Sequence, residues 1–224
     1  MNALFRLMAF IISGMLFSCN GDDGHTGNLS VTDSSQIQKM PLANAEDMDT
    51  TLSDSVAYTL KMQEFSTPGP EHKLLESLNG SWVAGLQSFS SDTSLPVPGK
   101  ATITQKSELG GRFFHSTFSG IIMGQPFEEV SISGFNNAKK QYHSILYNNR
   151  GTGFVFMEGH YNHITQTFTW TGTQTDLITG GNRKIKKIVK INNKNAFTLI
   201  LYETGSNAKE RKVLEGIFTK RKHR

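Results

Sequence analysis

Hydrophobic and polar residues alternate with a period of two along most of the chain beyond Gly80. Successive side chains of a β-strand point to opposite faces of a sheet, so this alternation predicts strands with one buried face. Turn formers such as Gly110-Gly111 and Asn192-Asn193 separate the segments, and connections this short make each strand pair with the next. The ten predicted strands are residues 82–89, 101–108, 112–119, 129–135, 142–147, 153–161, 167–174, 184–191, 196–203 and 212–219. Closing such a meander removes its exposed edges. The pattern therefore predicts an all-β fold, an antiparallel up-and-down β-barrel of about ten strands.

Two helices are predicted ahead of the strands. Residues 43–65 carry Leu52, Val56 and Leu60 at four-residue spacing, which is the period of a helix with a narrow apolar stripe. Residues 71–78 hold a second, shorter apolar stripe that ends before a glycine. We expect both helices to plug or cover the barrel, the alternative being that they bind a partner.

The N-terminus has the pattern of an export signal. Arg6 precedes an apolar run over residues 7–17, which is shorter than the roughly 20 residues that a membrane-spanning helix needs. The segment Leu16-Phe17-Ser18-Cys19 resembles the bacterial lipobox, in which the cysteine receives diacylglycerol. Cys19 is the only cysteine of the chain, so the folded part has no internal disulfide. We predict a lipoprotein signal peptide over residues 1–18, the alternative being ordinary secretion with an incidental cysteine.

The predicted domain order follows from the change in composition after the cysteine. Residues 19–42 are rich in Gly, Ser, Thr and Asp and form a lipidated flexible tether; residues 43–67 are the helical lead-in, and residues 68–224 the barrel domain. Asn20 differs from the Asp that retains lipoproteins in the inner membrane, and Asp22-Asp23 resembles an acidic export signal of Bacteroidota surface lipoproteins. The expected location is the cell envelope, lipid-anchored in the outer membrane, on either of its sides.

Seven segments in order resemble one family, the uncharacterised domain of unknown function 1579. They are Pro68 to His72, Leu78 to Trp82, Leu109 to Phe113, Met123 to Glu128, Gly134 to Asn137, Glu158-Gly159 and Asp176 to Gly180. The resemblance implies a lipocalin-like barrel and no established activity. The chain departs from the family at Phe135-Asn136, where Tyr-Asp is usual, and at Leu146-Tyr147-Asn148, where a Trp and a following Asp are usual.

Gly80-x-Trp82 at the start of the first strand resembles the opening motif of lipocalins. In that motif the Trp packs across the closed base of the barrel against a basic residue of the last segment, which here is Lys220 or Arg221. The role is structural, and a plain core tryptophan is the alternative.

Four residues are the candidate ligand-binding set: Arg112, Glu128, Glu158 and Trp170. Three of them are charges set among bulky apolar neighbours, and the two-residue period places Glu158 on one face with Phe156. If these faces point inward, an Arg112 to carboxylate pair lining a cavity is the economical arrangement, because an unpaired buried ion costs several kcal/mol. The competing interpretation places the charges at barrel ends, where they fix turns.

Catalytic and metal chemistry is weakly marked. His160-x-x-His163 falls where a strand runs into a turn, and His72 and His115 have no nucleophile or orienting acid marked by sequence. No metal and no cofactor are predicted. Nucleic acid is excluded as a partner despite the net charge of +4, because the chain is exported and its lysines alternate with apolar residues as on a solvated strand face.

Three functions are compatible with these patterns. The favoured one is an envelope lipoprotein whose barrel binds or carries a small apolar or amphipathic molecule. The first alternative is a non-catalytic envelope scaffold with a filled barrel, and the second is a hydrolase or isomerase using His and Glu in a pocket. The expected partners are the membrane, through the lipid anchor, and a small ligand; the oligomeric state is open.

Overall fold

A computed structural model describes residues 45–177, 179–205 and 209–221, with side chains from residue 53 onward. The predicted signal peptide, the lipidation at Cys19 and the tether lie outside the described residues. Within the described part of the chain, no helix is both long and apolar enough to cross a membrane.

The two helices differ in what they contact. Helix α1 (Ala45–Ser66) exposes every described side chain over residues 53–66, including Val56 and Leu60. The expectation that this helix covers the barrel is therefore wrong, because one apolar residue per turn is too narrow a stripe to pack against a sheet. Helix α2 (Pro70–Glu76) begins with a proline at its first turn and buries Leu75, which is 2% exposed.

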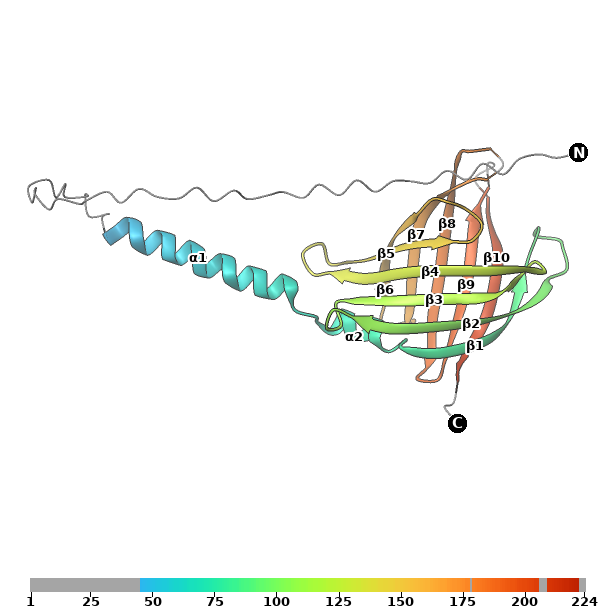
Figure 1. The fold of residues 1–224 in the computed structure, drawn as a ribbon, viewed down its shortest axis with the longest axis horizontal. Helices are drawn as coiled ribbons and strands as arrows, with labels where there is room; N and C mark the ends of the chain where they lie inside the picture. The colour runs from blue at the N-terminus through green and yellow to red at the C-terminus, as the bar shows by residue number, and fades with distance from the viewer. Residues whose placement is uncertain (1–44, 178, 206–208, 222–224) are drawn as a thin grey trace, which may run out of the picture. The chain divides into compact units, whose positions relative to one another are not determined.

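Ten antiparallel strands form a closed barrel in which each strand pairs with its neighbours in sequence and β1 pairs with β10 (Figure 1). The strands are β1 (Gly80–Ser88), β2 (Val97–Glu108), β3 (Phe113–Ile122), β4 (Gln125–Asn136), β5 (Gln141–Asn148), β6 (Val155–Asn162), β7 (Thr167–Thr175), β8 (Asn182–Asn193), β9 (Ala196–Thr204) and β10 (Glu210–Lys220). The predicted all-β barrel of about ten strands is confirmed.

Strand ends differ from the prediction where prolines stand inside strands. β2 begins at Val97 and β4 at Gln125, each four residues before its predicted start. Pro98 and Pro126 pair across the ladder near the beginnings of these strands, where the missing N–H is tolerated. A two-residue turn at Met123-Gly124 joins β3 to β4, and both residues have the positive φ that such a hairpin needs.

Aromatic side chains close the base of the barrel, the end where β1 begins. Trp82 and Phe218 are 1% and 0% exposed, and Phe197 contacts both rings with centroid distances of 5.0 Å. Trp82 Nε1 donates a hydrogen bond of 2.8 Å to the carbonyl oxygen of Leu78. The Nζ of Lys220, rather than Arg221, lies over the Trp82 ring, 5.1 Å from its centroid. This end of the interior is packed and its indole N–H is satisfied.

Helix α2 plugs the same end. Gln105 Nε2 donates to the carbonyl oxygen of Leu75 at 2.7 Å, and the Tyr142 hydroxyl donates to that of Glu71 at 3.3 Å. These bonds tie the helix to β2 and β5, so its apolar side chains face into the barrel as expected.

The opposite end is held by charge. Arg183 pairs with Asp176 and, at 2.8 Å, with Glu203. Arg211 lies 3.7 Å from the same Glu203 carboxylate and donates to the carbonyl oxygen of Ser90 at 2.8 Å. These pairs link β8, β9, β10 and the two adjoining loops at the rim.

Candidate ligand site in the barrel interior

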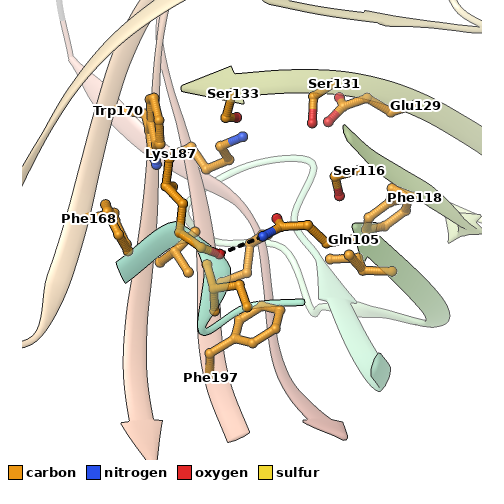
Figure 2. A pocket seen from close by; sticks show the side chains of 15 residues that line it. Gln105, Ser116, Phe118, Glu129, Ser131, Ser133, Phe168, Trp170, Lys187 and Phe197 are labelled. Atoms are coloured by element: carbon orange, nitrogen blue, oxygen red, sulfur yellow. Dashed lines mark hydrogen bonds between the residues drawn. The ribbon is translucent and has the colours of Figure 1, made fainter. Parts of the chain in front are cut away.

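A cavity of about 80 Å³ lies inside the barrel, above the α2 plug. It is lined by Leu75, Leu78, Ile103, Gln105, Ser116, Phe118, Glu129, Ser131, Ser133, Phe168, Trp170, Lys187, Val189, Phe197 and Leu199 (Figure 2). Each ordered water needs roughly 10–15 Å³ of such space, so the cavity has room for a handful of waters or for a ligand of a few heavy atoms. Drug-sized ligands occupy about 300–1,000 Å³ and do not fit the cavity in this state.

The cavity wall is divided into an apolar and a polar part. Leu75 of the α2 plug, Leu78 just after it and Phe197 on β9 belong to the apolar part, whereas Ser131 and Ser133 belong to a polar strip on β4. Ser116 on β3 extends this strip, and Glu129 ends it, as Figure 2 shows. The polar residues of β4 stand at every second position, so one strand supplies a carboxylate and two hydroxyls to one face.

Among the described residues that line the cavity, Glu129 on β4 and Lys187 on β8 are the two ionisable ones. Both are half-buried, and both border the open space. Lys187 carries its Nζ over the ring of Trp170, 5.7 Å from the centroid. Among the described residues, neither charged group makes an ion pair within 4.0 Å or a side-chain hydrogen bond. The two opposite charges therefore share a cavity without touching each other.

Burial favours the neutral form of both ionisable groups. Burial raises the pKa of the Glu129 carboxyl, and the Lys187 charge partly offsets this. Burial likewise lowers the pKa of the Lys187 amine, and the Glu129 charge works against that shift. An ionisable pair with opposed pKa shifts in a cavity is typical of functional sites.

The register of β8 explains how a lysine reaches the interior. Ile185 and Val189 are buried on the inward face, and Lys187 stands between them at the same two-residue period. Lys184 and Lys190 are exposed, and Lys186, which pairs with Glu210, is also on the outward face. Sequence reasoning missed Lys187, although a lysine in register with Ile185 and Val189 is the signal that marks it.

Of the four predicted ligand-binding residues, only Trp170 lines the cavity. Arg112 is exposed in the turn before β3, where its Nη1 donates to the carbonyl oxygen of Leu109 at 3.0 Å. Glu128 and Glu158 are exposed on the outward faces of β4 and β6. A shift of one position reverses the face of a strand residue, so Glu129, not its neighbour, is the interior acid. The predicted Arg112 to carboxylate pair across a cavity does not exist in this structure.

None of the histidines in the described part of the chain lines the cavity. His72 is buried in α2, where its Nδ1 accepts a hydrogen bond of 3.0 Å from the N–H of Gly69, and burial lowers its pKa. His160 and His163 are exposed, and His115 stands next to the inward Phe114 on β3. Within the described ranges, no group of three or more metal-ligating side chains is close enough to hold a metal. The geometry therefore gives no support to a hydrolase built on a pocket histidine.

The fold and the interior define the class of protein. It is a closed ten-stranded barrel with a small cavity whose wall carries two charged side chains. The chain belongs to the family described as "Protein of unknown function (DUF1579)", which matches residues 67–220. The predicted family is confirmed. No curated protein matches the chain.

Two solved structures illustrate the similarity of fold. The crystal structure of Rv2717c from M. tuberculosis aligns with a TM-score of 0.51 and 14% identity, covering 70% of this chain and 100% of that one. The structure of EF1p2_mFAP2b bound to DFHBI aligns with a TM-score of 0.39 and 8% identity, covering 67% and 98%. At these identities the comparison with Rv2717c concerns the barrel fold alone, and the second alignment carries no argument about function.

Proposed function

We propose that this protein binds a small amphipathic molecule inside its barrel. The observation that carries the proposal is the pair of charged groups, Glu129 and Lys187, that share one cavity without contacting each other. Taking an ion out of water costs several kcal/mol, and an ion pair that is not in contact recovers little of it. A filled scaffold would be more stable with apolar side chains at both positions. The charges are therefore best explained by a ligand that interacts with them.

The wall chemistry describes the ligand. Lys187 favours an anionic or carbonyl oxygen, and Glu129 favours a hydroxyl or amine that can donate a hydrogen bond. The Ser131 hydroxyl can donate or accept, whereas that of Ser133 donates to Ser144 and is left to accept. The apolar part of the wall, including Phe197, fits a short hydrocarbon tail.

The cavity volume limits the ligand to a few heavy atoms while α2 stays in place. Longer tails require the plug to move, and its attachment to the barrel includes the side-chain bonds from Gln105 and Tyr142. A weak Kd is expected for the short ligands, because even the best small ligands gain at most about 1.5 kcal/mol per heavy atom.

Butanoate titration tests the proposal with a probe of the right size. Chemical shifts of ¹⁵N-labelled protein should move for the amides around Lys187, and Lys187→Met should weaken binding at least tenfold. Lys190→Met is the matched control, because Lys190 is exposed on the same strand. Equal affinity for butanoate in the wild type and in Lys187→Met would show that the interior is not the binding site.

We also propose that the protein acts at the cell envelope as a lipoprotein anchored through Cys19, with the chain beyond residue 42 held off the membrane. The lipobox-like segment and the acidic tether of the sequence support this proposal. Radiolabelled palmitate should enter the wild type and not Cys19→Ser, which should keep its barrel fold. Label in the Ser variant, or none in the wild type, would contradict the anchor.

A further inference from the structure

We infer that Lys187 captures carbonyl compounds in the interior cavity, its amine forming an imine with a bound aldehyde or ketone while Glu129 donates and accepts the protons. The inference rests on the proposed function, because the carbonyl compound must first enter the same cavity.

The Lys187 amine is placed where a carbonyl compound in the cavity can reach it. Lys187 Nζ borders an open cavity whose wall also contains Phe168, Phe197 and Trp170, so a carbonyl carbon can approach it. Among the described residues, no carboxylate lies within ion-pair distance to hold it as an ammonium ion. Burial also lowers the pKa of this amine. A larger share of neutral, nucleophilic amine follows, as in lysines that form Schiff bases.

The other lysines with described side chains lack this environment. Lys186 pairs with Glu210 at 2.5 Å, Lys212 with Glu215 at 2.6 Å, and Lys184 and Lys190 are exposed. An exposed lysine near its ordinary pKa of about 10.4 has well under 1% free amine at neutral pH. Carbonyl capture should therefore be selective for Lys187.

Glu129 is the second group in this inference, because imine formation needs proton transfer. The neutral amine nitrogen attacks the carbonyl carbon, the C–N bond forms as the C=O π bond breaks, and a proton passes from that nitrogen to the oxygen to give a carbinolamine. The protonated Glu129 carboxyl then gives its proton to the carbinolamine hydroxyl, which leaves as water as the C=N bond forms. The resulting carboxylate accepts the proton released from nitrogen, so amine and carbonyl become imine and water. Burial raises the pKa of Glu129, so this carboxyl holds the proton that it must donate more readily than an exposed glutamate does.

The serines and the apolar wall fit the same reaction. Ser131 and Ser133 border the cavity on the strand that carries Glu129; the Ser131 hydroxyl can donate to the carbinolamine oxygen, whereas the Ser133 hydroxyl donates to Ser144 at 3.0 Å and can accept from the carbinolamine hydroxyl. The apolar wall limits the water that would hydrolyse the imine.

Reductive trapping with butanal tests the inference on the purified protein. At neutral pH, low butanal and cyanoborohydride should give one butyl adduct per chain, and peptide mapping should place it on Lys187. Lys187→Met and Lys187→Arg should lose this adduct, whereas Lys190→Met should keep it. Glu129→Gln should form it at least tenfold more slowly, since general acid–base groups contribute about 10²- to 10⁴-fold. Thermal melts establish that each variant is folded.

The outcomes separate the inference from the proposed function. Butanoate binding without a Lys187 adduct would overturn carbonyl capture and leave interior binding intact. Adducts spread evenly over surface lysines would overturn it as well. Failure of both butanoate binding and butanal trapping would remove the two proposals together. A single adduct at Lys187 that depends on Glu129 supports both.

Discussion

The aromatic base and the two cavity charges both lie inside the barrel and are built in opposite ways. At the base, Trp82, Phe197 and Phe218 pack ring against ring, and the indole N–H has a partner. In the cavity, Glu129 on β4 and Lys187 on β8 face open space without an ion-pair partner among the described residues. Packing of the first kind stabilises a fold, whereas unpaired charge in the interior destabilises it. The aromatic base therefore stabilises the barrel, whereas the two cavity charges are explained by the ligand that we propose.

Removing the aromatic base should have the largest effect on stability. Trp82→Ala deletes a side chain that is 1% exposed, and the free energy of unfolding should fall by about 3–5 kcal/mol. Urea unfolding followed by circular dichroism measures this loss. Leu95→Ala is the control, because Leu95 is 88% exposed and should change stability by less than about 0.5 kcal/mol. A loss below about 1 kcal/mol for Trp82→Ala would mean that the base does not depend on this ring.

Trp170→Ala sharpens the comparison between the two tryptophans. From the sequence, a Trp170 lining an open cavity should tolerate truncation, leaving the fold more nearly intact. In the structure it is 4% exposed and stacks on Phe168, so a loss of about 3 kcal/mol is expected, somewhat less than for Trp82 because it already borders empty space. The two variants should differ in binding. At temperatures where both remain folded, Trp170→Ala should lose butanoate binding and Trp82→Ala should keep it.

Gly159→Ala tests how tightly the Trp170 ring is held. A Cβ at Gly159 would lie 2.7 Å from Trp170 Cε3, which forces the ring to shift and should cost about 1–3 kcal/mol. Gly153→Ala is the matched control, since a Cβ there meets nothing within 4 Å. Equal melting temperatures for the two variants would show that Trp170 moves freely.

Replacing the two cavity charges together should stabilise the protein. The double variant Glu129→Gln and Lys187→Met keeps the side-chain volumes and removes both buried charges, so the free energy of unfolding should rise by about 1–2 kcal/mol. The same variant should bind no butanoate. Chemical unfolding and the titration are run on one preparation. A double variant less stable than the wild type would show that the charges support the fold instead of a ligand.

The sequence predicted the barrel well because its signal is repeated in every strand. The prediction of ten strands from alternating segments and turns holds even where a predicted strand end is wrong by a few residues, as for β2 and β4. The predicted family and the helix of residues 71–78 as a plug have the same kind of support, from several residues acting together.

The cavity residues were harder to predict because the direction of each side chain depends on a single position in one strand. Choosing Glu128 over Glu129 reversed the side-chain direction, and the apparent partner, Arg112, belonged to a turn. β8 carries four other basic residues, and Lys187 differs from them in the sequence only by its place between the inward-facing Ile185 and Val189. No local pattern reports that β4 and β8, which are not neighbours in the barrel, contribute to the same cavity.

The pH dependence of stability gives the smallest effect and isolates Glu129. Its pKa in the folded protein lies above the ordinary carboxyl value of 4.5, chiefly because of burial. Between these two values the unfolded chain has lost the proton and the folded chain still holds it, so stability must fall as pH rises through this window. The slope cannot exceed about 1.4 kcal/mol per pH unit for one group. Lys187, whose folded pKa is lowered, acts in the opposite direction at higher pH, where stability rises with pH up to the ordinary lysine value of 10.5.

Urea unfolding of the wild type and Glu129→Gln from pH 4 to pH 8 separates this contribution from other groups. The wild type should lose stability relative to the variant as pH rises from about 4.5, and the difference should become constant once the folded carboxyl has ionised. Glu128→Gln is the matched control, because it makes the same substitution one residue away, at an exposed position on the outward face of β4. A stability difference between the wild type and Glu129→Gln that does not change with pH would mean that the carboxyl is as well solvated in the barrel as in the unfolded chain.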